Sequence, residues 1–287
     1  MSEAMAVDGS EDPLAGPPEP IAAPRPLWYQ LLDGLQTQLT VIHAVVLRET
    51  RTRFGEQKLG YLWAFFEPLA VIVTFWVAFG ISGRPPQAGM DLVTFIATGL
   101  LPYELITSTA DRAAEAINGN RTLLYYPQVH RLDLVFARAL LEAATLITVF
   151  VIIIATDALL TGGVHIEDPF GVMLVLILAS FFGTALGLVY CMLGVVTTLV
   201  DRLRGPLMRP LFWISGIFFT ANELGDEVRD LLLWNPFLHV IELLRGSWSA
   251  YYEPRGASPA YVISCSLVLF ALGLLLERRV RTKVEVG

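Results

Sequence analysis

The chain of 287 residues has 54% hydrophobic residues and a mean hydropathy of +0.58, too high for an ordinary soluble domain. The net charge is −7, and no basic stripe remains beyond the Lys and Arg expected beside membrane spans, so we expect no nucleic-acid partner. Cys191 and Cys265 fall in apolar segments, which favours small core residues over a disulfide or a metal framework.

Residues 1–26 combine acidic residues with six prolines, a composition typical of a disordered tail. This segment has no apolar core of its own and does not resemble a signal peptide. Residues 27–58 follow as an expected amphipathic helix, opened by Trp28 and Tyr29 and closed by an arginine cluster. We interpret it as lying along the cytoplasmic membrane surface; the alternative is a soluble helix packed on the cytoplasmic face.

Apolar segments long enough to cross a bilayer need roughly 20 residues. Six are predicted between residues 59 and 277, and the fifth is short: 62–82, 92–111, 134–160, 170–199, 207–221 and 259–277. Glu67 and Pro68 stand inside the first, where an ionisable residue is costly and suggests function. Gly183 and Gly187 form a GxxxG pattern in the fourth, which favours tight packing within the chain over a dimer contact.

The basic residues indicate the orientation of these spans. Of the 20 Lys and Arg residues, sixteen fall in the N-terminal region, alternate loops and the tail of residues 278–287. The positive-inside rule then places both termini in the cytoplasm, which requires an even number of spans and agrees with six.

The loop of residues 112–133 is too polar to be inserted and too patterned to be random. We expect a short helix over Arg121–Tyr126, ended by Pro127, that docks a soluble partner; the alternative is a solvated connector. The last external stretch, 222–258, has an apolar middle that is too short to cross and is broken at Asn235-Pro236. We expect it to re-enter the membrane or to lie at the outer interface.

Aromatic and basic residues at the two ends of the expected bundle are possible contacts for a transported polymer. Trp63 and Phe66 are three residues apart and share a helix face, while Trp234, Trp248 and Tyr251 surround the last external stretch. These outer rings form either an aromatic belt at headgroup level or the mouth of a path on which sugar rings stack. Arg51 and Arg53 match phosphate or carboxylate groups bidentately, although simple attraction to anionic lipid explains them equally well.

Several catalytic motifs are absent from the sequence. There is no GxxxxGK[ST] run, GxSxG, HExxH or paired-cysteine metal spacing, so we expect no catalytic residue, metal or cofactor on this chain. The acidic residues Glu67, Glu104, Glu142 and Asp157 are scattered in sequence, and Arg138 is four residues from Glu142, which predicts mutual neutralisation. His239 and Glu242 have no third partner for a metal.

Three segments resemble one family. LRETRTRFGEQKLGYLWAFFEPL, LLYYPQVHRLDLVFARALLE and LLWNPFLHVIELLRGSW are similar to motifs of the membrane permeases of capsular polysaccharide exporters, the KpsM type, which are type-2 ABC exporter permeases. The resemblance covers most of residues 40–277, and the middle motif is shared with O-antigen and teichoic acid exporters. The tail of residues 1–26 is outside the pattern.

The resemblance implies an all-α integral membrane protein with an amphipathic interface helix, six spans and re-entrant helices before the last span. It implies a gate segment over Arg53–Tyr61, with Tyr61 beside the substrate path. It also implies a coupling helix between spans two and three, for which Asn120, Arg121, Thr122, Tyr125 and Tyr126 are the matching residues.

The implied partners are a second copy of the chain and two copies of an ABC ATPase of the KpsT type, which bind the ATP and Mg. An envelope-spanning adaptor and an outer-membrane channel would carry the substrate, a lipid-anchored acidic polysaccharide, onward from the inner membrane. The same architecture could instead export O-antigen, teichoic acid or a small hydrophobic compound. An intramembrane enzyme, such as a lipid-linked glycosyltransferase, would need clustered carboxylates, and a passive channel would show flux without ATP.

Overall fold

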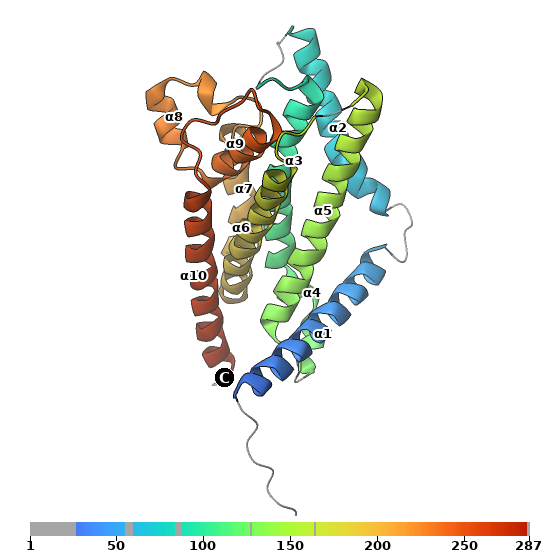
Figure 1. The fold of residues 1–287 in the computed structure, drawn as a ribbon. Helices are drawn as coiled ribbons and strands as arrows, with labels where there is room; N and C mark the ends of the chain where they lie inside the picture. The colour runs from blue at the N-terminus through green and yellow to red at the C-terminus, as the bar shows by residue number, and fades with distance from the viewer. Residues whose placement is uncertain (1–26, 55–59, 84–87, 127, 164, 286–287) are drawn as a thin grey trace, which may run out of the picture. The chain divides into compact units, whose positions relative to one another are not determined.

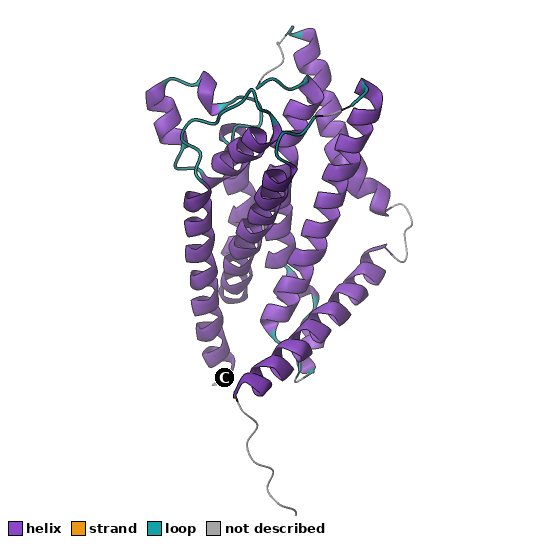
Figure 2. Ribbon diagram, in the orientation of Figure 1, coloured by secondary structure: helices purple, strands orange, loops and turns teal. Residues whose placement is uncertain are grey.

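The computed structural model describes residues 27–54, 60–83, 88–126, 128–163 and 165–285, and every regular element within them is a helix (Figures 1 and 2). The predicted tail 1–26 and most of the link between the first two helices lie outside these residues. The chain divides into two compact units after Gln38. The first contributes only the start of α1 (Leu27–Phe54), and the second contains all the other helices.

Within the described residues, four helices are long and apolar enough to cross a membrane, and each coincides with a predicted span. They are α3 (Leu92–Ala114), α5 (Arg131–Thr161), α6 (Pro169–Val196) and α10 (Pro259–Glu285), the last through Val280. The described part of the chain is therefore all-helical, and its long apolar helices are those of a multi-pass membrane protein.

The first and fifth predicted spans correspond to two further helices, α2 and α7. The first coincides with α2 (Gly60–Ile81), whose described apolar part runs from Phe65 to Ile81. The fifth was predicted over 207–221, but α7 (Leu199–Ile214) begins eight residues earlier and ends at Ile214, with Ser215 as its C-cap. Pro206 and Pro210 lie inside α7, and a non-helical turn follows it.

Capping residues define where several of these helices begin and end. Asp91 accepts hydrogen bonds from the amides of Val93 and Thr94, both at 3.1 Å, at the start of α3. Asp168 accepts from the amide of Gly171 at the start of α6. Gly162 ends α5 with φ of 89°, a left-handed conformation that glycine adopts without strain.

The centre of the second unit is α3, which packs against α2, α5, α6 and α9. Gly183 and Gly187 of α6 allow its backbone to approach α3 closely. A Cβ atom on Gly187 would lie 2.5 Å from the Cβ of Ala113, and one on Gly183 would lie 2.7 Å from the carbonyl oxygen of Ile106. The GxxxG pattern therefore serves packing inside one chain, as predicted.

One end of the bundle, which we call the α4 end, carries α4 (Ala116–Gly119) and the 3-10 helix η1 (Arg121–Tyr125). The helix predicted over Arg121–Tyr126 is thus present as a single 3-10 element. The part of α1 in the second unit packs here, with Val45 buried against residues of α5 and α6. This half of α1 covers the bundle, while Leu39 and Leu47 are exposed.

The opposite end, which we call the α9 end, carries η2 (Ala221–Glu223), α8 (Asp226–Leu232) and α9 (Pro236–Trp248) (Figure 1). The predicted break falls between α8 and α9. The Asn235 side chain accepts from the amide of Phe237 and caps α9, and Pro236 occupies its first turn. α9 packs against α3, α6 and α10, so it is an internal helix of the bundle.

Candidate functional site

A polar cavity of about 490 Å³ lies between α2, α3, α5 and α7. Its lining side chains are Glu67, Pro68, Tyr103, Glu104, Thr107, Ser108, Asp111, Arg112, Glu115, Glu142, Thr145, Leu146 and Phe212. Ionisable groups in spans face the bundle interior or water rather than lipid. The face formed by α2, α3, α5 and α7 is therefore suited to water or a polar molecule.

The scattered carboxylates of the sequence meet in this cavity. Glu67 is 37 residues from Glu104 and 75 from Glu142 along the chain, but α3 packs against both α2 and α5 and brings the three groups to one lining. Asp157 lies elsewhere, where it accepts from the Thr94 hydroxyl at 3.0 Å. No group of three or more His, Cys, Asp or Glu among the described residues could hold a metal ion.

Arginines neutralise part of this acidic lining. The Arg204 guanidinium on α7 lies 2.6 Å from Glu115 and 3.5 Å from Asp111, which ties α7 to the end of α3. Arg112 lies 3.7 Å from Glu142. The cavity thus presents carboxylates, the Arg112 guanidinium, hydroxyls and two aromatic rings, a mixture suited to a hydroxyl-rich molecule.

The predicted neutralisation of Glu142 by Arg138 is wrong. Arg138 instead places Nε 3.0 Å from Oε1 of Glu49 on α1, while Glu142 has Arg112 as its ion-pair partner. An arginine on the N-terminal side of a glutamate at four-residue spacing is the weaker orientation of such a pair. Residues on other helices, rather than the four-residue spacing, therefore determine the ion pairs of Arg138 and Glu142.

Asn120, predicted to contact an ATPase, is almost entirely buried at the α4 end, with 2% of its surface exposed. Its Oδ1 atom accepts from Nη1 of Arg48 at 2.9 Å, and its Nδ2 atom donates to Oε1 of Glu49 at 2.6 Å. Both partners belong to α1. Asn120 therefore serves as an internal link between two segments.

The other residues predicted for docking form an exposed surface on and beside η1. Arg121 and Thr122 are exposed, and the rings of Tyr125 and Tyr126 are 88% and 63% exposed. Two large aromatic rings beside a basic side chain match the composition of protein-protein contact sites. These exposed side chains can contact a protein partner without any rearrangement of the loop.

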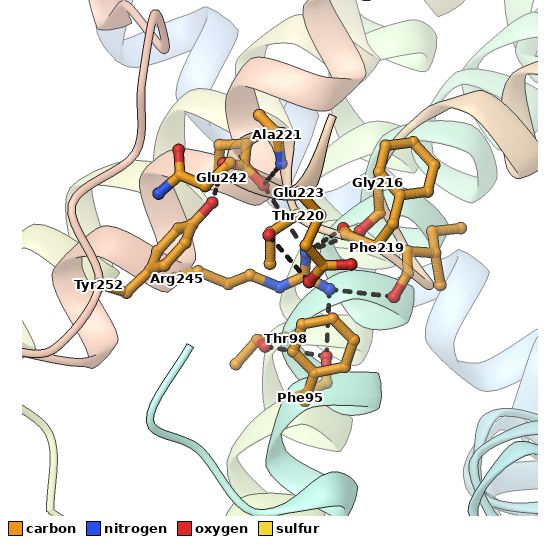
Figure 3. Close-up of polar contacts among 12 residues, drawn as sticks. Phe95, Thr98, Gly216, Phe219, Thr220, Ala221, Glu223, Glu242, Arg245 and Tyr252 are labelled. Carbon is orange, nitrogen blue, oxygen red and sulfur yellow. Dashed lines mark hydrogen bonds and ion pairs between the residues drawn. The ribbon is translucent and has the colours of Figure 1, made fainter. Parts of the chain in front are cut away.

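A second buried polar cluster lies at the α9 end and is centred on Arg245 of α9 (Figure 3). Its guanidinium donates to four backbone carbonyl oxygens, those of Gly216, Ile217, Phe219 and Phe95, at 2.7 to 3.3 Å. Three of these carbonyls belong to the turn that follows α7. This arginine therefore satisfies backbone groups that the end of α7 leaves without helical partners.

Glu242 completes this cluster one turn before Arg245. Its Oε1 atom lies 3.7 Å from Nη1 of Arg245 and accepts from the amide of Ala221, while Oε2 accepts from the Tyr252 hydroxyl. Burial raises the pKa of Glu242, and the adjacent guanidinium opposes that shift. The pKa of Tyr252 is raised by its burial and by the nearby Glu242 carboxyl.

His239 of α9 makes two hydrogen-bonding contacts with backbone groups outside that helix. Its Nε2 atom lies 2.7 Å from the carbonyl oxygen of Leu233, and its Nδ1 atom accepts from the amide of Ser258 at 2.9 Å. Burial lowers the pKa of His239, which favours the neutral ring. Because each ring nitrogen already has a backbone partner, the histidine joins α8, α9 and the start of α10.

The outer aromatic residues differ strongly in exposure. Trp234 and Tyr251 are exposed, whereas Trp248 is 3% exposed and packs edge-to-face with Phe150 at 5.9 Å between ring centroids. Trp248 and Tyr251 also line a cavity of about 270 Å³ at the α9 end. Trp248 thus belongs to the core of the bundle as well as to the edge of this cavity.

The residues predicted at the cytoplasmic entrance are only partly described. Arg51 is exposed at the end of α1, and the Phe66 ring on α2 is about half exposed beside Glu67. The side chains of Arg53, Tyr61 and Trp63 lie outside the described part of the structure. Their placement on the substrate path stays a prediction.

Comparison with known proteins identifies the family. Residues 40–248 match the family of ABC-2 type transporters, which is well over half of the chain. The chain belongs to the ABC-2 type transporter family. The matched region of this ABC-2 protein contains the polar cavity, the Asn120 link and the Arg245 cluster.

Two curated relatives of this ABC-2 transporter protein match nearly end to end, and a third matches over a shorter region. The polysialic acid transport protein KpsM of Escherichia coli is 34% identical over 248 residues, covering 86% of this chain and 95% of that protein. The capsule polysaccharide export inner-membrane protein CtrC of Neisseria meningitidis is 30% identical over 258 residues, covering 88% and 96%. The O-antigen export system permease protein RfbA of Klebsiella pneumoniae is 17% identical over 194 residues, covering 68% and 74%.

Proposed function

We propose that this chain is the membrane permease of an ATP-driven exporter that moves lipid-anchored acidic capsular polysaccharide from the cytoplasm to the periplasm. The observation that carries the proposal is the near-complete match to capsule export proteins at 30–34% identity. The O-antigen permease matches less of the chain at about half that identity, which favours capsule over O-antigen export. The permease would lie in the bacterial inner membrane.

In this proposal the chain crosses the membrane six times, with both termini in the cytoplasm. α2 and α7 add two spans to the four long apolar helices, and the distribution of basic residues sets the orientation. The pair α8 and α9 would re-enter from the periplasmic side. The burial of α9 within the bundle supports this arrangement, because non-helical backbone at membrane depth must be covered by protein.

The substrate path would run along the polar cavity of α2, α3, α5 and α7. A long polymer must slide without being held, so many weak and similar contacts suit it better than one tight site. Hydroxyls and carboxylates can bond to sugar hydroxyls in turn, and Tyr103 and Phe212 offer ring faces. The predicted path residues Arg51, Arg53, Tyr61, Trp63 and Phe66 would lead into this cavity, and Trp234, Trp248 and Tyr251 would line its exit.

The energy would come from a separate ABC ATPase that binds ATP and Mg, because this chain has no P-loop. Two permease copies would pair with two ATPase copies. The exposed surface of Arg121, Thr122, Tyr125 and Tyr126 would dock each ATPase. An envelope-spanning adaptor and an outer-membrane channel would continue the route.

Co-purification from the native host tests this proposal. Purified full-length chain in detergent should carry an ABC ATPase and an acidic glycolipid, both identified by mass spectrometry. Polysaccharide export should stop when the ATPase loses its P-loop lysine. Export that continues with that lysine replaced, or flux through the purified chain without ATP, would contradict the ATP-driven function and favour a passive channel.

A further inference from the structure

The second half of α1 and the α4–η1 loop share one apolar core at the α4 end. Val45 of α1 is buried with Ala116 and Ile117, and Leu123 and Leu124 of η1 pack against the same cluster. The loop is made of one short helix and one 3-10 turn. Such a segment has little intrinsic stability, so its position depends on these neighbours.

A polar link reinforces this apolar contact. Asn120 accepts from Arg48 and donates to Glu49, so both hydrogen-bonding ends of one buried amide are directed to α1. The Asn120 amide bonds to a guanidinium on one side and to a carboxylate on the other, so both hydrogen bonds are charge-assisted. They are short and directional, and they fix the loop against α1 in one register.

Arg138 of α5 extends the link. Its Nε and Nη2 atoms lie 3.0 and 3.4 Å from the two carboxylate oxygens of Glu49, a bidentate arrangement, while Nη1 donates to the carbonyl oxygen of Glu115 at 2.9 Å. The same guanidinium lies beneath Gly119. A Cβ atom there would lie 2.5 Å from Nη2, so a larger residue would displace the guanidinium from this position.

These contacts join an exposed docking surface to the helix that precedes the first span. Tyr125 and Tyr126 lie five and six residues after the buried Asn120, and α1 is followed in the chain by α2, which carries Glu67 into the polar cavity. We propose that Asn120, Glu49 and Arg138 are positioning residues that bind the α4–η1 loop and α1 into one moving body. A displacement of the loop by the ATPase would then be passed to α1 and to the entrance of the path. This inference rests on the proposed function.

Glu49→Ala tests the link, because it removes the one carboxylate that both Asn120 and Arg138 contact. We expect the complex to assemble and the ATPase to hydrolyse ATP at a near-normal rate. Polysaccharide exported per ATP should fall roughly five-fold or more, the lower end of coupling between sites. A residue that only supported the fold would lower assembly, hydrolysis and export together. His43→Ala, an exposed change on the same helix, is the matched control.

A covalent link gives the second test. Glu49→Cys with Asn120→Cys, in a chain whose Cys191 and Cys265 are replaced by Ala, should export poorly as free thiols. Bridging the two thiols with a short bifunctional cross-linker should restore export, because a body that moves as one tolerates a permanent bond inside it. Formation of the bridge is read by mass spectrometry of the cross-linked peptides.

The outcomes separate this inference from the proposed function. If the unmodified chain neither carries an ATPase nor exports polysaccharide, the proposed function is wrong. If it does both, normal export per ATP by Glu49→Ala overturns the inference. So does equal loss of assembly and export in that variant, or a cross-linked double-cysteine chain that exports no better than the same chain with free thiols.

Discussion

The Nη1 atom of Arg245, a side chain with no exposed surface, donates to the carbonyl oxygen of Gly216 at 2.7 Å. Gly216 lies just after the end of α7 and has φ of 83°. This bond explains how the chain can leave helical geometry inside the buried core. The guanidinium donates to turn carbonyls that have no backbone N–H partner from a helix. The same group lies 3.9 Å from the ring centroid of Phe95, which adds a cation–π contact.

Arg245→Lys should destabilise the protein even though it keeps the charge. An ammonium group cannot direct two separate nitrogens to four carbonyls, so several buried acceptors lose their donor. We expect a loss of about 3 kcal/mol in the free energy of unfolding, measured by thermal unfolding of the full chain in detergent. Arg255→Lys, at an exposed position, should leave the melting temperature unchanged. Equal melting temperatures for the two variants would contradict this role.

Gly187→Ala should weaken the packing of α6 on α3. The added methyl would lie 2.5 Å from the Cβ of Ala113 and 2.7 Å from the carbonyl oxygen of Ala110, so the two helices must separate. Overpacking of this kind costs about 1–3 kcal/mol. Gly194→Ala on the same helix is the control, because its added methyl would lie 3.7 Å from Asp201 Oδ1, an ordinary van der Waals contact. The prediction fails if both variants melt at the temperature of the unmodified chain.

Periodicity and length alone locate the four long spans and the break at Asn235-Pro236, because these depend on local composition. The α7 boundary was misplaced. The apolar run continues through Ile217 and Phe218, which are buried in the turn after α7, and burial rather than helix formation explains its composition. The Gly187 contact was predicted because small residues at helical spacing carry a direct packing meaning.

The polar clusters could not be predicted in the same way. Glu67, Glu104 and Glu142 are brought together by the packing of three helices, and nothing in their spacing indicates this. Arg138 could have paired with Glu142 or with a distant partner, and only the position of α1 decides for Glu49. For Arg245, the signal in the sequence is an arginine within an apolar segment, and its four carbonyl partners come from other parts of the chain.

His239 should make stability depend on pH. Burial lowers its pKa, and protonation would place a proton on Nδ1, which already accepts from the amide of Ser258. The folded protein therefore binds fewer protons at this site than the unfolded chain, whose histidine titrates near about 6.5. Stability is fully present above that pH and is lost as pH falls below it.

The melting temperature should thus fall between about pH 7 and pH 5, and His239→Gln should reduce the slope. His165→Gln, which removes a largely exposed histidine, should leave the slope as it is. An identical slope in the unmodified and His239→Gln chains would show that this ring does not contribute.

The η1 surface should cross-link to the ATPase. Thr122 is exposed between Arg121 and the two tyrosines, so Thr122→Cys presents a thiol where the partner is proposed to dock. With a short thiol cross-linker in membranes from the native host, we expect a product containing both proteins. Ser82→Cys, at the exposed end of α2, should give no such product and should instead be labelled from the periplasm. Periplasmic labelling of Thr122→Cys without a product would overturn both the topology and the docking role.

Trp248 and Phe66 should respond differently to substitution, although both are predicted to contact the polymer. Trp248 is packed against Phe150 in the core, so Trp248→Ala should cost about 3–5 kcal/mol and lower inserted protein and export together. Phe66 is half exposed, so Phe66→Ala should change stability by no more than about 0.5 kcal/mol. If its ring contacts sugar, export should nevertheless fall at a normal level of inserted protein. Phe66→Leu restores the apolar volume without a ring face, so it should not restore export. Immunoblotting of membranes and cell-surface polysaccharide give the two readings, and full export by Phe66→Leu would end the stacking role.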